Sequence, residues 1–195
     1  RAPQIAMGVS PKTLPQYRQL SDLKGRRIGV SAPGSSTNMV ANLVLARAGI
    51  RPHEVQFVGV GTSAGALRAF RMGEIDALSN IDPVMTVLEK SGEIRIVSDT
   101  RTLKGTKDVF GGPMPAACLY APQAFIERHP ATCQALANGV VHALKWLQTA
   151  GPSDIIKAVP ERYFQGDRAL YLAAFARVRE AWTADGLMPE TGPAT

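Results

Sequence analysis

Three consecutive units of an apolar strand, a polar loop and an amphipathic helix constrain the fold of this chain more than any other sequence feature. The strands are expected near residues 27–31, 55–60 and 75–78. Strands that alternate with helices predict a parallel sheet with crossover helices. Because parallel strands end at the same edge of a sheet, the three loops should share the edge where open α/β sheets bind ligands.

The first of these loops contains the most groups that could hold a ligand. Residues 33–38 read Pro-Gly-Ser-Ser-Thr-Asn and directly precede an amphipathic helical pattern. The hydroxyl groups of Ser35, Ser36 and Thr37 can each cap that helix. A helix start also collects free N–H groups and a partial positive charge, which can bind an anion. Capping alone and ligand binding both remain open interpretations of these residues.

The second and third loops offer similar groups. Gly61, Thr62 and Ser63 follow the second strand, and Asn80 and Asp82 follow the third. Asp82 stands directly before a proline, so we expect Asp82 to cap a helix whose first residue is that proline.

The second half of the chain is expected to be mainly helical. Residues 99–115 read as a long polar segment, and residues 116–121 read as a strand. A long helix is expected to follow and to end near residue 149, before the Gly-Pro pair at 151–152. Asp167 is expected to cap the last long helix.

Composition and charge narrow the class of protein. The chain has 195 residues, of which 45% are hydrophobic and 19% charged, as in an ordinary globular protein. Its net charge is +6, but the basic residues are scattered and do not alternate with aromatic residues, so we expect no nucleic-acid partner. No apolar run is long enough to span a bilayer. Cys118 and Cys133 are expected to be buried free thiols.

No recognisable catalytic or metal-binding motif occurs in the sequence. His53, His129 and His142 are isolated, and there is no zinc-protease, nucleophile-elbow or P-loop motif. The run from Gly59 to Ala64 has the outline of a dinucleotide fingerprint, but the nearest acidic candidate, Asp82, begins a helix instead of ending a second strand. We therefore expect no catalytic residue, no metal ion and no cofactor.

Several segments, taken in order, resemble substrate-binding proteins of ABC transporters. They are Asp22-Leu23-Lys24-Gly25-Arg26-Arg27-Ile28-Gly29-Val30, Pro33-Gly34-Ser35-Ser36-Thr37, Gly73-Glu74-Ile75-Asp76-Ala77 and Asp185-Gly186-Leu187-Met188-Pro189. The most similar branch includes nitrate-, sulfonate- and taurine-binding proteins and binders of thiamine-pyrimidine precursors. This resemblance implies an α/β, type II periplasmic binding fold. One lobe would have three layers, with a mainly parallel sheet and helices on both faces, and the C-terminal helices would come from a second, incomplete lobe.

The resemblance also implies a division of the chain and a set of ligand-binding residues. Residues 1–20 would be a strand and connector of an incomplete first lobe, residues 21–150 a second α/β lobe, and residues 151–195 helices of the first lobe. The residues implied to contact the ligand are Ser35, Ser36, Thr37, Asn38, Gly61, Thr62, Ser63, Asn80 and Asp82.

The function implied by the resemblance is that of the solute-binding component of an ABC import system. The protein would be periplasmic, with its signal peptide outside this chain, and would not be an enzyme. It would bind a small polar or anionic organic molecule, such as a sulfonate, nitrate, a carboxylate or a pyrimidine, between two lobes. It would then deliver that molecule to a membrane permease. The alternative is a ligand-sensing effector domain of a regulator with the same fold.

Overall fold

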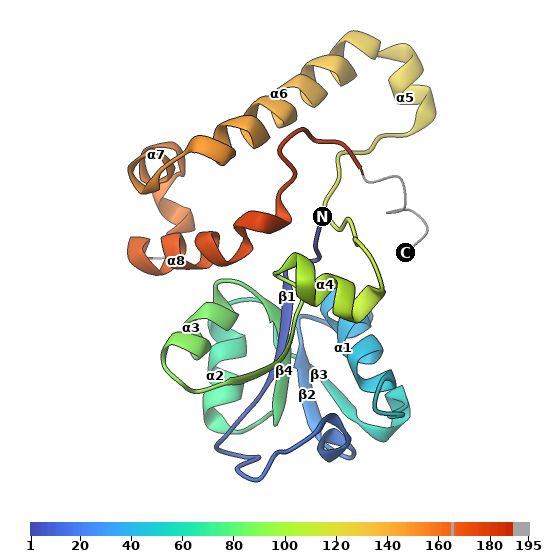
Figure 1. The fold of residues 1–195 in the computed structure, drawn as a ribbon, viewed down its shortest axis with the longest axis vertical. Coiled ribbons are helices and arrows are strands. Elements are labelled where there is room, and N and C mark those ends of the chain that lie inside the picture. Colours follow the sequence, from blue (N-terminus) through green and yellow to red (C-terminus); the bar gives the residue numbers. More distant parts are fainter. Residues whose placement is uncertain (165, 189–195) are drawn as a thin grey trace.

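The computed structural model of the chain describes residues 1–164 and 166–188, so Pro189 of the quoted ending lies outside the described residues. A five-stranded sheet with the order β3-β2-β4-β1-β5 forms its centre (Figure 1). Its strands are β1 (Ile5–Val9), β2 (Arg27–Val30), β3 (Gln56–Gly59), β4 (Ala77–Ile81) and β5 (Arg95–Asp99). β2 pairs in parallel with β3 and β4, whereas β1 pairs antiparallel with β4 and β5. Four strands therefore run in one direction and β1 runs in the other.

Helices cover both faces of the sheet, because alternate strand residues face two separate cores. In β1, for example, Met7 belongs to one core and Ala6 to the other. The first core is covered by α1 (Ser36–Ala46) and α4 (Leu103–Phe110), and the second by α2 (Ala64–Met72) and α3 (Val84–Lys90). The predicted three-layer α/β fold is thus confirmed, with a mixed sheet.

Gly29, in the middle of β2, shows how closely the second core is packed. A Cβ atom added at this position would overlap Ile75 and would lie 3.0 Å from Leu78. The absence of a side chain at position 29 lets these two residues pack directly on the central strand.

The remaining helices lie apart from the sheet (Figure 1). They are α5 (Gln123–Arg128), α6 (Pro130–Thr149), α7 (Pro152–Ala158) and α8 (Arg168–Val178), of which α8 is capped by Asp167 as predicted. Short 3₁₀ helices occur at Leu20–Leu23, Pro52–Glu54, Glu161–Tyr163 and Arg179–Ala181. Within the part of the chain that the structure describes, no helix has both the length and the apolar character that a membrane crossing requires.

The segment between β5 and α5 differs from the sequence-based expectation. Residues 99–115, expected to be a polar loop, contain α4. The hydroxyl of Thr102 accepts a hydrogen bond from the Gly105 N–H at 2.9 Å and so caps this helix. A Cβ at Gly105 would collide with the carbonyl group of Asp99. The glycine is therefore required by close packing and does not mark a loop.

The predicted strand at 116–121 is also wrong. This segment is extended but pairs with no other strand among the described residues, and Tyr120 is 87% exposed. Both cysteines are free, but Cys118 is exposed and Cys133 is only partly covered, so the expectation of buried thiols is wrong as well. An apolar run predicts a strand only when a neighbouring strand is available to pair with it.

One part of the expected division of the chain needs correction. Residues 5–9 were assigned to an incomplete first lobe, but β1 is hydrogen-bonded on both sides within this sheet, to β4 and β5. Within the expected 21–150 lobe, α5 and α6 lie away from the sheet, on the side of α7 and α8 (Figure 1). How the whole protein divides into lobes stays a prediction.

Candidate functional site at the carboxyl edge of the sheet

The edge at which β2, β3 and β4 end, here called the carboxyl edge, brings the three predicted loops together. The backbone N–H of Gly61 donates to the Ser31 carbonyl at 3.1 Å, which joins the second loop to the first. The side-chain amide of Asn80 donates to the Gly61 carbonyl at 2.9 Å, which joins the third loop to the second. The predicted convergence of the loops is therefore confirmed, whereas their contact with a ligand stays a prediction.

The loop before α1 is held by a group of three hydroxyls. The oxygen of Thr37 lies 2.9 Å from that of Ser31 and 2.8 Å from that of Ser35, and Ser31 donates to Ser35 at 2.9 Å. Ser35 is the helix cap, and its hydroxyl accepts from the Asn38 N–H at 3.4 Å. These bonds support the capping interpretation for Ser35, while Ser36 lies exposed at the first helical position.

Asn38 and Thr37 are both buried beneath this loop. The Asn38 side-chain oxygen accepts from the Gly34 N–H at 2.9 Å, and the Thr37 carbonyl accepts from the Ser79 hydroxyl at 2.8 Å. Both residues therefore fix the shape of the loop and its attachment to β4.

The loop before α2 presents its polar groups to the solvent. Gly61, Thr62 and Ser63 are all exposed. Ser63 occupies the cap position of α2, but its side chain makes no capping hydrogen bond. Gly61 has a φ of 73°, a left-handed conformation that glycine adopts without strain. This loop therefore offers two hydroxyls beside a helix start.

The third group of predicted residues is mostly engaged inside the protein. Asn80 is buried within β4, and its side-chain oxygen accepts from the Ile81 N–H at 2.9 Å. The Asp82 carboxylate accepts from the Thr86 N–H at 2.8 Å, but α3 begins at Val84, one residue later than the expected start at Pro83. Asp82 thus caps the helix as expected, across one more residue.

A buried ion cluster beside this edge was not predicted. The Arg101 guanidinium is fully buried and donates to Asp99 at 2.8 Å and to Glu89 at 3.0 Å, and it lies 3.5 Å from Asp82. Glu89 also pairs with Arg177 of α8 at 2.9 Å. Burial alone would lower the pKa of Arg101, but the hydrogen bond and charge of Asp99, with the two other carboxylates, raise it above its ordinary value.

The ion cluster gives Asp82 a second partner and connects the third loop to α3, β5 and α8. Its one sequence signal is an acidic residue two positions before an arginine at the end of a strand. That signal is too common to identify a buried cluster.

The predicted residues fall into two groups by exposure. Ser36, Gly61, Thr62 and Ser63 are exposed, whereas Thr37, Asn38 and Asn80 are buried, and Ser35 and Asp82 are half-buried. The exposed group supplies hydroxyl donors next to two helix starts, an arrangement that suits the oxygens of an anionic or polar molecule. The others hold the loops in place.

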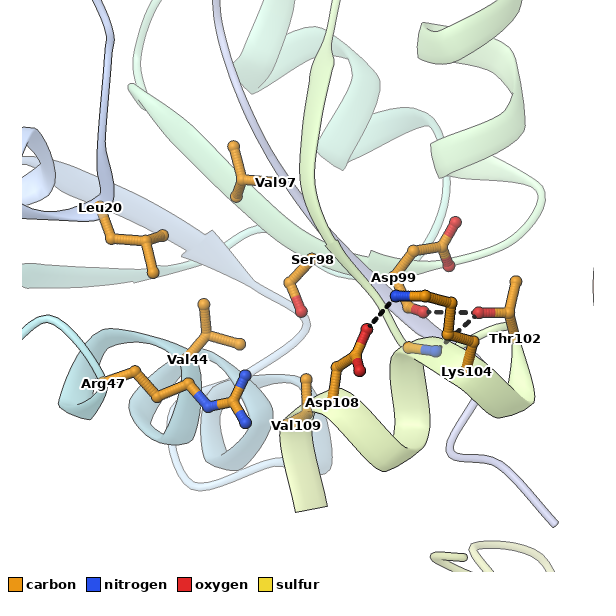
Figure 2. A pocket seen from close by; sticks show the side chains of 11 residues that line it. Leu20, Val44, Arg47, Val97, Ser98, Asp99, Thr102, Lys104, Asp108 and Val109 are labelled. Atoms are coloured by element: carbon orange, nitrogen blue, oxygen red, sulfur yellow. Dashed lines mark hydrogen bonds and ion pairs between the residues drawn. The ribbon is translucent and has the colours of Figure 1, made fainter. Parts of the chain in front are cut away.

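Two cavities lie elsewhere on the surface, and neither is lined by a predicted residue. One, of about 620 Å³, lies between α1 and α4 (Figure 2). The other, of about 460 Å³, lies among Arg1, Leu103 and residues of the C-terminal helices. Across residues 1–164 and 166–188, no cluster of His, Cys, Asp or Glu side chains could hold a metal ion.

Residues 8–159 match the NMT1-like family, and the chain therefore belongs to this family. A structure from Bordetella bronchiseptica RB50 is 58% identical to it, with a TM-score of 0.92, over 100% of this chain and 61% of that one. The alkanesulfonate-binding protein SsuA from Xanthomonas axonopodis pv. citri, bound to MOPS, has 21% identity and a TM-score of 0.64, over 96% of this chain and 58% of that one. The periplasmic aliphatic sulphonate binding protein SsuA from Escherichia coli has 16% identity and a TM-score of 0.68, over 90% and 55%.

The two SsuA structures show that this chain has the fold of type II periplasmic binding proteins, and the resemblance to the nitrate, sulfonate and taurine branch is confirmed. A more distant structure, a mutant of the desulfurization enzyme DSZB in complex with biphenyl-2-sulfinic acid, has 16% identity and a TM-score of 0.50, so the fold by itself does not distinguish binding from catalysis. No curated protein matches the chain. The chain spans about three fifths of the length of the solved chains named first.

Proposed function

We propose that this chain is part of the solute-binding protein of an ABC importer and forms one side of its ligand site. The ligand is a small polar or anionic organic molecule that contacts the carboxyl edge through exposed hydroxyls and the starts of α1 and α2. In this proposal the protein binds and releases its solute unchanged, without a cofactor, and is not an enzyme.

The observation that carries this proposal is the hydrogen-bonded junction at Gly61. Its N–H and its carbonyl connect it to Ser31 at 3.1 Å and to Asn80 at 2.9 Å. The junction fixes the loop that carries Ser36 relative to the loop that carries Thr62. One solute can then be held by two loops at once, without first paying the entropy of ordering them.

The chemistry of the exposed residues favours oxygen-rich ligands. Hydroxyls and helix-start N–H groups donate hydrogen bonds to sulfonate, carboxylate and nitrate oxygens, and hydroxyls also accept bonds from a pyrimidine. The charge of Arg101 is already balanced by three carboxylates. Sulfonates are the first class to test, because the names of the two SsuA neighbours state that they bind alkanesulfonates or aliphatic sulphonates.

The setting of the whole protein belongs to the same proposal. The protein works in the periplasm and delivers its solute to a membrane permease. The alternative, an effector domain of a regulator, would bind similar ligands and pass a signal to an attached domain. The complete reading frame distinguishes the two, because a signal peptide indicates the transport component and a helix-turn-helix domain indicates the regulator.

Calorimetric titration of the full chain with MOPS, taurine, nitrate, small carboxylates and pyrimidines tests the site. The double variant Ser36→Ala/Thr62→Ala should weaken binding at least tenfold, because each lost hydrogen bond is worth about 1 kcal/mol and about 1.4 kcal/mol corresponds to tenfold. The matched control is Thr132→Ala/Ser153→Ala, which removes two exposed hydroxyls from α6 and α7 and should bind normally. Unchanged affinity in the first variant would place the site elsewhere, and no binding of any compound would contradict a solute-binding role.

A further inference from the structure

The cavity between α1 and α4, here called the lateral groove, lies on one face of the sheet (Figure 2). Its volume of about 620 Å³ is within the range of roughly 300–1,000 Å³ that is usual for small-molecule sites. None of the nine residues predicted to bind the solute lines this groove, so any ligand it holds is separate from the proposed function.

The floor of the lateral groove is apolar. Val44 of α1 is buried in the first core, and Leu20, Val97 and Val109 are partly buried residues packed against that same core. Figure 2 shows these side chains around the Ser98 hydroxyl. The floor is therefore an uncovered margin of the hydrophobic core, where an apolar body would lose contact with water.

The rim of the groove carries a surplus of positive charge. Arg47 projects from α1, and Lys104 of α4 pairs with Asp108 at 2.7 Å. The hydrogen bond from Lys104, with the charges of Lys104, Arg47 and Lys107, lowers the pKa of the Asp108 carboxyl, so three cations surround one carboxylate. The other carboxylate that lines the groove, Asp99, is already paired with the buried Arg101.

Arg47 is the cation available to a ligand. Among residues 1–164 and 166–188, it forms no ion pair within 4.0 Å, whereas Lys104 has Asp108 as its partner. An apolar floor beside an unpaired guanidinium complements a molecule with one negative head and an apolar body.

We infer that the lateral groove is a second binding site, for a small amphipathic monoanion. Its carboxylate or sulfonate head pairs with Arg47, and its alkyl or aryl body lies on Leu20, Val44, Val97 and Val109. The inference uses no residue of the carboxyl edge, and it stands or falls independently of the proposed solute site.

Titration of the full chain with butanoate, hexanoate, octanoate and neutral octan-1-ol tests this inference, by calorimetry and by NMR of the valine and leucine methyl groups. Affinity should rise about threefold for each added methylene group, which follows from burial of the alkyl chain. Octanoate should bind more tightly than octan-1-ol because only octanoate pairs with Arg47. The methyl signals of Val44, Val97 and Val109 should shift.

Two variants test the two halves of the site separately. Arg47→Gln should weaken octanoate binding about fivefold or more through loss of the charged hydrogen bond. Val109→Trp should fill the groove and weaken binding at least tenfold while it keeps every charge. The matched control is Arg68→Gln, an exposed arginine on α2, which covers the opposite face of the sheet, and it should bind octanoate normally.

Several results would overturn the inference. These are no binding of octanoate, equal affinity for octan-1-ol, or octanoate affinity that neither Arg47→Gln nor Val109→Trp changes. Loss of octanoate binding in Ser36→Ala/Thr62→Ala, with normal binding in Arg47→Gln, would place octanoate at the carboxyl edge instead. Failure of the sulfonate titrations alone would contradict the proposed function and leave the lateral groove supported by its own results.

Discussion

The helices that flank the sheet and the long helix α6 differ in what covers their apolar residues. α1 has 11 residues, and six of them, including Val40 and Val44, are buried against the sheet. α6 has 20 residues, and none of them is buried. Its apolar positions, such as Leu136 at 50% exposure, face outward. The same helical periodicity therefore leads to a packed helix in one region and an uncovered one in the other.

The difference teaches that periodicity predicts a helix but not what will cover it. Leu119, Tyr120, Ile126, Leu136 and Val140 are all exposed on the segment from residue 116 onward. Exposed apolar surface of this kind usually marks a site of contact with another part of a protein. The solved relatives are longer than this chain, and the expectation that the C-terminal helices belong with a further lobe stays a prediction.

The largest expected effect comes from the buried ion cluster. Arg101→Met would leave Asp82, Asp99 and Glu89 beside one another without their shared cation, at a cost of about 3–5 kcal/mol. The matched change in the helical region is Arg168→Met, which breaks an exposed ion pair with Glu161 and should cost less than about 1 kcal/mol. Urea unfolding of both variants measures the contrast, and equal losses would show that the two regions do not differ in this way.

A second contrast uses apolar residues of the two regions. Leu78 is fully buried in the second core, and Leu78→Ala should lower the free energy of unfolding by about 2–5 kcal/mol through lost burial and a new cavity. Leu136→Ala should change it by less than about 0.5 kcal/mol. Chemical unfolding measures both values. A large loss for Leu136→Ala would mean that α6 is covered in solution, for example by a second copy of the chain.

The smallest expected effect depends on pH. Burial would raise the pKa of Asp76, but hydrogen bonds from Arg27 lower it below its ordinary value. Because its pKa is lower in the folded chain, this carboxylate stabilises the fold above the unfolded value near pH 4, and the stabilisation is lost as the pH falls through the folded value. Asp76→Asn should cost about 1–3 kcal/mol at pH 7. The difference from the wild type should shrink below about pH 4 in urea unfolding, and pH-independent differences would contradict this assignment.

Local patterns were sufficient to predict much of the fold. Alternating apolar residues predicted β1 and β2, and the caps at Ser35 and Asp167 predicted two helix starts that the structure contains. The same patterns could not assign partners to the strands. Residues 5–9 were correctly predicted as a strand, but its pairing with β4 and β5 depends on residues far away in the sequence.

The candidate site was predictable in outline and not in its division of roles. Ser79 and Asn80 read as loop residues because they are polar, yet both are buried in β4. Their side chains donate to carbonyl groups 42 and 19 residues away in the sequence, at Thr37 and Gly61. No local pattern carries such contacts, and this also explains why Arg101 was missed.

The separation of buried and exposed groups at the carboxyl edge has a consequence for how such proteins diversify. Thr37, Asn38 and Asn80 maintain the scaffold from within, so replacing the outward-facing side chains of Ser36, Thr62 and Ser63 alters ligand preference without remodelling the backbone. A change of transported nutrient would then require only a few surface substitutions and little loss of stability.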